Sequence, residues 1–387
     1  MKKICIVTGT RAEYGLLKPI IDKVYRSGEL ELQLVVTGAH LSPEFGMTYR
    51  EIEDDRYPIC SKIEMLLSSD TSVGITKSMG VALIGFADFF GNHKPDMVII
   101  LGDRYEMLAC ASAALAAKIP IAHIGGGEKT EGAIDEAIRH SITKMSLLHF
   151  TATDEYRNRV IQLGEQPDMV YNVGALGVEN IRNIKLLRKE ELERQINFRF
   201  SAPTIMITYH PVTMEMMTSR DQFANLLTAI DHHKDISIIF TKANADMDGR
   251  IINRMIDEYV EKNSDRCVVY TSLGQLKYLS ALQFCDAVAG NSSSGLIEVP
   301  SFGIPTIDIG DRQRGRVAAR SVIHCGYGVS EIDKALQTAL SVEFRSKLRE
   351  VRNPYEKEGT SCQITEIIKN TFHNGIEMKK KFYDIGE

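Results

Sequence analysis

The chain has 387 residues, which is long for a single hydrophobic core and suits two domains. Its 44% hydrophobic and 25% charged residues are typical of a soluble globular protein and argue against a disordered one. The formal net charge of −5 excludes a general positive field for nucleic acid or an anionic membrane. Any phosphate group must therefore be recognised by a few placed arginines and backbone N–H groups.

The first residues and the cysteines together predict a cytoplasmic protein. Residues 1–3 are followed by an apolar stretch that is too short for a signal peptide. No apolar run approaches the length of roughly 20 residues that a membrane-spanning helix needs. The seven cysteines are scattered and form no C-x-x-C pair, which is typical of reduced thiols rather than of disulfides or a zinc site.

In the first half of the chain, short apolar strands alternate with amphipathic helices. A helix is predicted from about residue 16 to Ser27-Gly28, and others near 105–117, over 135–144 and from 154. This alternation predicts a parallel sheet with right-handed crossovers. The predicted strands are, in chain order, 4–7, 30–37, 97–101, 119–124, 149–151 and 169–173.

The pattern weakens over residues 174–177 and the charged stretch 185–194, which we predict to be a hinge, and then restarts. Strands are predicted at 203–209, 236–241, 267–270, 286–289 and 305–309, and a last helix at 364–374. The prediction is an α/β protein with two Rossmann-like, doubly wound domains facing a cleft. The predicted parts are an N-terminal domain 1–174, a second domain 175–355, and a C-terminal helix and tail 356–387, with the helix packing back on the first domain.

Polar residues follow nearly every predicted strand. Ligands of doubly wound folds bind outside the carboxyl ends of the strands, so residues at these positions are expected to converge. Together they indicate an active site for a polar ligand. The candidates are Arg11, His40, Asp103, Arg104, Glu128, Asp135, His210, Asn244, Ser292, Ser293, Ser294, Glu298 and Arg312.

The stretch Asn291-Ser292-Ser293-Ser294-Gly295 favours a diphosphate. Small residues between a strand and a helix expose backbone N–H groups at the helix N-terminus, although the same serines could be ordinary N-caps. The carboxylate of Glu298 suits a ribose diol, or else a solvated helix face. The guanidinium groups of Arg11, Arg104 and Arg312 can bind phosphate oxygens in a forked geometry, or form surface ion pairs.

Acidic residues and a histidine could handle protons. Asp103 follows a buried run and a glycine, so its carboxylate needs a partner, for which Arg104 and His210 are the candidates. Glu128 and Asp135 flank a glycine-rich loop and a helix start, where carboxylates also serve as caps. The chain shows no metal-ligand spacing, no Walker loop and no dinucleotide glycine fingerprint, so we expect neither a metal nor a redox cofactor.

Taken in order, these loops resemble the UDP-N-acetylglucosamine 2-epimerase family, and more narrowly its hydrolysing branch, which serves sialic-acid-type sugar biosynthesis. The non-hydrolysing branch would show E-A-G-x-R-T followed by P-E-E-x-N-R, where this chain has GGEKTEGAIDEAIRH. The matching strings are GTRAEYGLL, TGAHLSPEFG, LGDRYE, GGEKTEGAIDEAIRHSITK, HPVT and GNSSSGLIEVPSFGIPTIDIGDRQRGR.

The resemblance implies a glycosyltransferase-B-type fold, with the sugar on the side of the first domain and UDP held mainly by the second. It implies elimination of UDP to a 2-acetamidoglycal, followed by hydration to the free 2-epimer, N-acetylmannosamine for the simplest substrate. It also implies a homodimer or homotetramer, and no cofactor. By the same resemblance Ser292, Ser293, Arg312, Arg11 and Arg104 contact the diphosphate, Glu298 contacts the ribose, and Asp103, Glu128, Asp135 and His210 surround the sugar.

One position departs from the family pattern. Many hydrolysing members carry an acid where this chain has Gly125. Either Glu128 or Asp135 takes over its role, or glycine makes room for a bulkier sugar. The second option predicts a nucleotide-linked 2,4-diacetamido-2,4,6-trideoxyhexose of the legionaminic acid type as the alternative substrate. A UDP-sugar glycosyltransferase and a non-catalytic UDP-sugar sensor are the competing functions.

Overall fold

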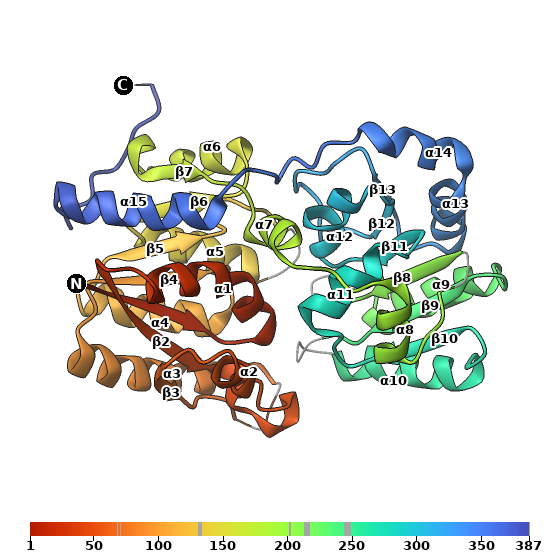
Figure 1. Ribbon diagram of the computed structural model, residues 1–387, viewed down its shortest axis with the longest axis horizontal. Coiled ribbons are helices and arrows are strands. Elements are labelled where there is room, and N and C mark those ends of the chain that lie inside the picture. Colours follow the sequence, from red (N-terminus) through yellow and green to blue (C-terminus); the bar gives the residue numbers. More distant parts are fainter. Residues whose placement is uncertain are drawn as a thin grey trace. The chain divides into compact units, whose positions relative to one another are not determined.

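The computed structural model describes residues 1–387 except 68, 70, 131–133, 201–202, 213–216, 244–248 and 387, and the side chain of residue 349. The chain forms two compact units (Figure 1). Unit 1 comprises Met1–Glu128, Ile134–Asn180 and Lys357–Glu387, and unit 2 comprises Lys129–Ala133 and Ile181–Glu356. The chain thus passes between the units at 128/129, 133/134, 180/181 and 356/357, whereas the boundaries that we predicted from the sequence are 174/175 and 355/356.

Unit 1 is built on a seven-stranded, entirely parallel sheet. The strand order is β3-β2-β1-β4-β5-β6-β7, so β1 stands between β2 and β4, where the direction of winding reverses. The strands are β1 (Lys2–Thr8), β2 (Leu30–Thr37), β3 (Ile59–Ile63), β4 (Met97–Leu101), β5 (Ile121–Ile124), β6 (Leu148–Thr151) and β7 (Val170–Asn172).

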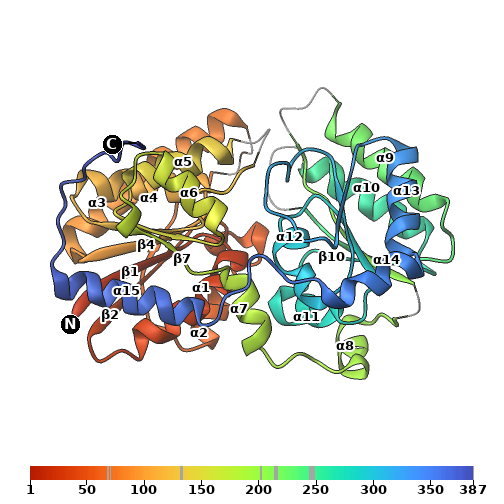
Figure 2. The same ribbon diagram turned by 90° about the horizontal axis from the view of Figure 1, so that it is seen from above.

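Helices cover both faces of this sheet (Figure 2). One face carries α1 (Arg11–Tyr25), α2 (Tyr49–Asp54) and α15 (Thr360–Asn374), and the other carries α3 (Ser72–His93), α4 (Tyr105–Ala116) and α5 (Asp135–Met145). The C-terminal helix α15 packs on α1 and contributes the fully buried Ile364 and Ile368 to the unit 1 core. The remaining helices of unit 1 are η1 (Gly38–Leu41), η2 (Pro43–Phe45), α6 (Asp154–Gln162), η3 (Pro167–Met169) and most of α7 (Leu176–Asn183).

Helix α3 has a property that the sequence analysis did not anticipate. Among the residues that the structure describes, it is the one helix long and apolar enough to cross a membrane, with 22 residues and a mean hydropathy of 1.4 over its best window. Its inner face, with Phe86, Phe89 and Phe90 buried, belongs to the same hydrophobic core as α4. This is the environment of a core helix, although its outer face also exposes Val81 and Ile84.

Unit 2 repeats the same architecture with a six-stranded parallel sheet. Its order is β10-β9-β8-β11-β12-β13, so β8 occupies the place that β1 has in unit 1. Helices α9, α10 and α13 pack in one hydrophobic cluster, and α8 and α11 in another. The strands are β8 (Thr204–Thr208), β9 (Ser237–Thr241), β10 (Cys267–Tyr270), β11 (Ala287–Gly290), β12 (Thr306–Ile309) and β13 (Val322–Cys325). The helices are α8 (Lys189–Ile196), α9 (Ser219–Asp231), α10 (Gly249–Lys262), α11 (Gly274–Leu282), α12 (Ser294–Ile297), η4 (Val299–Phe302), α13 (Val329–Leu340), α14 (Val342–Ser346) and η5 (Lys347–Glu350).

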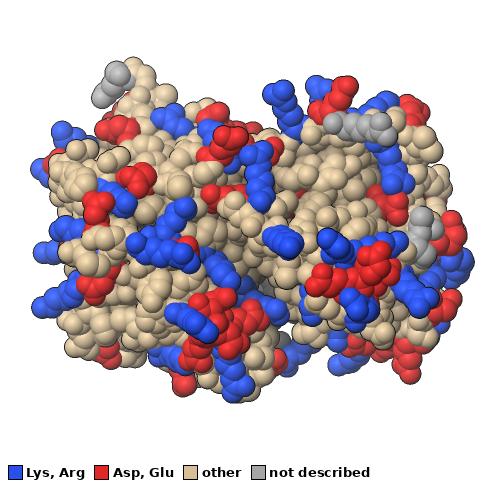
Figure 3. Space-filling model, in the orientation of Figure 1, with Lys and Arg blue, Asp and Glu red and all other residues tan. Residues whose placement is uncertain are grey.

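The predicted class, α/β with two Rossmann-like doubly wound domains, is confirmed by the two sheets. The strands β3 and β13, each at one edge of its sheet, and the helix α3 were not predicted. The stretch predicted as a hinge contains helices α7 and α8, because Leu192 and Ile196 bury an apolar face there. On the face drawn in Figure 3, basic and acidic side chains are interspersed, as expected for a small net charge.

Candidate active site

In each unit, some of the predicted site residues follow the two strands at which the strand order reverses, and others follow β2, β5 and β12. In unit 1 the two strands at the reversal are β1 and β4, and in unit 2 they are β8 and β11. Parallel strands present their carboxyl ends at one edge of the sheet, so the loops after them are neighbours. The two sets of residues are described in turn.

Asp103, directly after β4, is bound by a buried arginine that the sequence analysis did not single out. Arg139 lies on α5 with 1% of its surface exposed, and its Nη2 donates to Oδ2 of Asp103. Its Nη1 donates to the carbonyl oxygen of Glu128 at 2.8 Å. The partners we predicted for Asp103 were Arg104 and His210, whereas the structure pairs its carboxylate with Arg139 on α5. One signal was available, because Arg139 follows Asp135 by one helical turn and so shares its face.

Arg104 is bonded to Glu106, one of two buried acids that the sequence analysis also missed. Its Nε donates to Oε1 of Glu106 at 3.0 Å, and Glu106 is fully buried. Nearby, Oε2 of Glu13 accepts hydrogen bonds from the N–H groups of Gly9 at 2.7 Å and Thr10 at 3.0 Å. Burial, reinforced by the charge of Glu106, raises the pKa of Glu13 to about 7. The pair can therefore hold a proton near neutral pH beneath the loop after β1.

His40 and Arg11 lie at the ends of β2 and β1. His40, in η1, is completely buried, with Nε2 3.0 Å from Oγ1 of Thr8 and Nδ1 2.8 Å from Oγ1 of Thr48. Burial lowers the pKa of His40 to about 4, so its ring is neutral at pH 7. Arg11 is the first residue of α1 and its Nε lies 2.9 Å from Oε1 of Glu51, with 38% of its side chain exposed.

Glu128 and Asp135 follow β5. Asp135 is the first residue of α5 and is half-buried. Gly125 has φ +89°, a conformation that L side chains rarely adopt, and a Cβ built there would lie 3.9 Å from Oε1 of Glu128. The carboxylate of Glu128 is therefore beside the position from which an acid at residue 125 would extend.

In unit 2, the side chain of Asn291 connects the loops after β8 and β11. Its Oδ1 accepts the N–H of His210 at 2.7 Å, and its Nδ2 donates to the carbonyl of His210 at 2.7 Å. The carbonyl of Asn291 accepts hydrogen bonds from Nη1 of Arg312 at 2.9 Å and Nε2 of Gln313 at 2.8 Å. Asn291 is fully buried, so His210 and Arg312 are held by one rigid, uncharged residue.

The serine loop differs from the prediction in one respect. Helix α12 begins at Ser294 and has only four residues, so the expected helix dipole behind the loop is weak. Ser292 and Ser293 are half-buried, whereas the hydroxyl of Ser294 lies 2.7 Å from that of Tyr278. Glu298 follows α12 directly and is half-buried. Anion binding at this loop must therefore depend on hydroxyls, N–H groups and Arg312 more than on a helix dipole.

Lys129 and Thr130, directly after Glu128, belong to unit 2. They are hydrogen-bonded there by Arg316, which was not among the predicted site residues. Nε of Arg316 donates to the carbonyl of Lys129 at 2.7 Å, and Nη2 to Oγ1 of Thr130 at 3.0 Å. The remaining candidate, Asn244, lies outside the described residues. Across the described parts of the chain, no three His, Cys, Asp or Glu residues form a group that could hold a metal ion.

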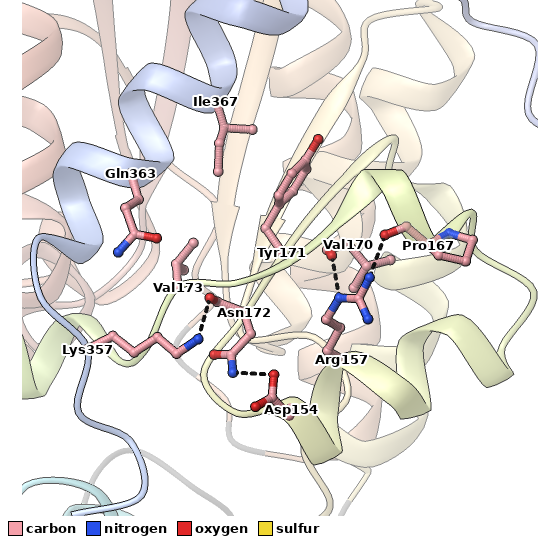
Figure 4. Close-up of a pocket in the computed structure, with 10 residues that line it drawn as sticks. All are labelled: Asp154, Arg157, Pro167, Val170, Tyr171, Asn172, Val173, Lys357, Gln363 and Ile367. Carbon is pink, nitrogen blue, oxygen red and sulfur yellow. Dashed lines mark hydrogen bonds between the residues drawn. The ribbon is translucent and has the colours of Figure 1, made fainter.

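A separate pocket of about 390 Å³ lies on unit 1 beside the edge strand β7 (Figure 4). Its polar groups bond to one another: Lys357 Nζ donates to the carbonyl of Asn172 at 3.1 Å, and Nδ2 of Asn172 to Asp154 at 2.7 Å. Arg157 donates to the carbonyls of Val170 and Pro167, each at 2.8 Å. None of the predicted site residues lines this pocket, so we do not include it in the candidate site.

Comparisons with known proteins show the family and the fold. Residues 22–369 match the family described as UDP-N-acetylglucosamine 2-epimerase. A protein of Campylobacter jejuni named GDP/UDP-N,N'-diacetylbacillosamine 2-epimerase (hydrolyzing) is 45% identical over 344 residues, which are 89% of each chain. The Escherichia coli polysialic acid biosynthesis protein P7 is 40% identical over 388 residues, covering 100% of this chain and 98% of that protein. The crystal structure of UDP-GlcNAc 2-epimerase from Neisseria meningitidis bound to UDP-GlcNAc has a TM-score of 0.82 at 19% identity, with 95% of this chain and 100% of that chain covered, which shows a common fold.

Proposed function

The chain belongs to the UDP-N-acetylglucosamine 2-epimerase family, and from this premise we propose that it is a hydrolysing 2-epimerase of a UDP-linked 2-acetamido sugar. The observation that carries the proposal is the bonding of Asp103 and the Glu128 carbonyl to one buried arginine, Arg139. Proton removal from a carbon atom needs an ionised carboxylate fixed in one orientation. Arg139 supplies both the positive charge and the geometry for this.

We assign the leaving group to unit 2 and the proton steps to unit 1. Arg312 and the loop of Ser292 and Ser293 would stabilise the charge on UDP as the C1–O bond breaks and its electron pair leaves with the nucleotide. A carboxylate, Asp103 or Glu128, would take the proton from C2 as the C1–C2 double bond forms. Water then adds its hydroxyl group to C1, and a proton returns to C2 from the opposite face. The products are UDP and the free 2-epimer, and the proposed reaction uses no cofactor.

For the substrate, we put a 2,4-diacetamido-2,4,6-trideoxyhexose first, because the relative named for such a sugar is 45% identical. UDP-N-acetylglucosamine, which the sequence analysis put first, is the second candidate, supported by the 40% identical relative named for polysialic acid biosynthesis. The same proposal includes a cytoplasmic location for the protein, because its proposed substrates are nucleotide sugars.

The test is proton NMR in deuterated water with each nucleotide sugar in turn and no acceptor. The proposal predicts UDP and a free, 2-epimerised sugar that carries deuterium at C2. An intact, epimerised nucleotide sugar would contradict hydrolysis. Transfer of the sugar only when an acceptor is added would favour the glycosyltransferase, and binding without turnover of either substrate would favour the sensor.

We further propose that the expected homo-oligomer forms through the outer face of α3. This face exposes Val81 and Ile84 between Lys77 and Asp88. In an antiparallel pairing of two copies of α3 about a two-fold axis, Lys77 of each copy would meet Asp88 of the other, and the apolar side chains would be covered. Mass photometry of Ile84→Lys tests this, because a shift from dimer to monomer is expected and an unchanged mass would exclude this face.

A further inference from the structure

The segment after α15 has no regular secondary structure, yet it is bonded to the body of unit 1. Lys380 is its main contact, with 28% of its side chain exposed. Its Nζ donates to the carbonyls of Lys144 at 3.0 Å and Ser146 at 2.6 Å, and lies 2.6 Å from Oε2 of Glu165. Because Lys144 and Ser146 end α5, Lys380 caps the C-terminus of that helix with a cation, where the last carbonyls have no partner in the helix.

Glu165 connects this cap to other charged groups. Its carboxylate is 2% exposed and also accepts from Nζ of Lys144 at 2.6 Å and Nε2 of His149 at 2.9 Å. Burial by itself would raise the pKa of Glu165, but the hydrogen bonds from His149, Lys144 and Lys380 outweigh it and lower the pKa to about 2. Glu165 is therefore ionised, and the buried carboxylate depends on its cationic partners.

Neighbouring contacts fix the segment in register. The N–H of Tyr383 donates to the carbonyl of Gly164 at 2.9 Å, and Nε2 of Gln166 donates to the carbonyl of Lys381 at 3.3 Å. Phe382 packs so closely on Gly164 that a Cβ there would lie 2.2 Å from its ring, and Gly164 has φ +86°. Glycine is thus favoured by the backbone conformation, and its missing side chain leaves room for the ring of Phe382.

The capped end of α5 is linked to the candidate catalytic residues through short contacts. Oγ1 of Thr143 donates to the carbonyl of Arg139 at 3.0 Å and lies 3.2 Å from Nδ1 of His123. Nε2 of His123 lies 2.8 Å from the carbonyl of Gly102, the residue before Asp103. Since that carbonyl can only accept, Nε2 carries the proton. The same short helix therefore has the Lys380 cap at one end and the arginine that binds Asp103 in its middle.

We propose that residues 376–386 act as a strap that fixes α5, so that Lys380 is a positioning residue for Arg139 and, through it, for Asp103. This deepens the proposed function and rests on it. Helix α5 has only 11 residues, and a helix this short owes its stability to its contacts rather than to its own hydrogen bonds. Loss of the cap would let α5 fray or shift, and a displacement of about 1 Å at a catalytic group can cost roughly a hundredfold in rate.

The test compares Lys380→Met, which keeps the apolar stem and removes the donors, with Lys379→Met, its exposed neighbour. Hydrogen–deuterium exchange should show the amides of the last turn of α5 exchanging about tenfold faster in Lys380→Met, and unchanged in Lys379→Met. Turnover should fall about tenfold with KM within about twofold, since a positioning residue for Asp103 acts on the chemical step. Lys380→Arg can still donate to the carbonyls and to Glu165. Both the amide exchange of α5 and the turnover should therefore stay close to those of the wild type.

The two readouts separate failure of this proposal from failure of the proposed function. Unchanged exchange in α5 in Lys380→Met overturns the strap, whatever the activity. Faster exchange with unchanged turnover overturns the positioning role. If the wild-type protein turns over no nucleotide sugar, the proposed function fails, while the exchange comparison still decides whether the segment fixes α5.

Discussion

The two strand-end sites share a topology and differ in chemistry. Both sheets reverse their order at the first strand of the unit, and in both units several of the candidate residues follow that strand and its neighbour. In unit 1 the loops after β1 and β4 carry charged, buried groups, with Asp103 bound by Arg139 and Glu106 by Arg104. In unit 2 the loops after β8 and β11 meet at Asn291, an uncharged side chain.

This difference shows that the strand order determines where a site can form, whereas the residues of the loops determine its chemistry. A guanidinium beside a carboxylate favours its ionised form and fixes its orientation, and the ionised form is the one that can accept a proton from a substrate. An amide cannot titrate, so Asn291 can connect the loops after β8 and β11 in the same way over a wide pH range. The predictions below separate these two roles, beginning with the largest expected effect.

Asp103→Asn should remove most turnover and leave UDP binding nearly intact. The amide keeps the size of the carboxylate but cannot accept a proton, so we expect a loss of about 10² to 10⁴ in kcat. Calorimetric titration with UDP should give a dissociation constant within about threefold of wild type, because the nucleotide is assigned to unit 2. Equal losses of binding and turnover would contradict the separation of roles.

Asn291→Ala should have the opposite pattern. It removes the bonds to both backbone groups of His210 and leaves those groups buried, at a cost of about 1 to 3 kcal/mol. We therefore expect UDP to bind roughly 10 to 100 times more weakly, because the loops after β8 and β11 lose their common support. Asn263→Ala, in the turn after α10, is the matched control, since its side chain bonds only to the carbonyl of Tyr259 among the described residues. A variant of Asn291 that binds UDP normally would show that the support is dispensable.

The positions of the loops could be predicted from the sequence, but their partners could not. The apolar run 97–101 followed by Gly102-Asp103 identified a buried strand and its polar end, because both signals are local. The bond from Arg139 to Asp103 joins residues 36 positions apart and depends on the rotation of α5, which no local pattern reports. The burial of Glu106 could not be predicted either, because a carboxylate in the first turn of a helix is usually exposed to solvent.

The pH dependence of stability should distinguish the buried acids Glu13 and Glu106 of unit 1 from the uncharged Asn291 of unit 2. Burial, followed by the charge of Glu106, raises the pKa of Glu13 from 4.5 to about 7 in the folded state. Between these values the folded state binds the proton and the unfolded state does not, so stability falls as pH rises from about 4.5 to about 7 and is level above that. Ionisation of the group therefore destabilises the folded protein at pH 8 by about 3 kcal/mol, relative to pH values below 4.5.

Glu13→Gln should remove this fall, because glutamine can accept the same N–H groups without ionising. We expect the variant to be more stable than wild type at pH 8 by about 3 kcal/mol, and to show no such gain at pH 5. Urea unfolding at both pH values, followed by circular dichroism, measures the effect. The exposed Glu31→Gln is the control and should change neither value. A gain of equal size at both pH values would mean that titration of Glu13 is not its cause.

The smallest expected effect separates the serines within the unit 2 loop. The hydroxyl of Ser294 is paired with that of Tyr278 at 2.7 Å, whereas Ser293 is half-buried at the start of the same turn. If the loop holds a diphosphate through its hydroxyl groups, Ser293→Ala should weaken UDP binding by about 1 kcal/mol, or roughly fivefold. Ser294→Ala should change UDP binding by less than about twofold and instead lower thermal stability, since it leaves the buried Tyr278 hydroxyl without its partner. The reverse order of affinities would mean that the loop binds the nucleotide through another arrangement than the one in this structure, with Ser294 released from Tyr278 when UDP binds.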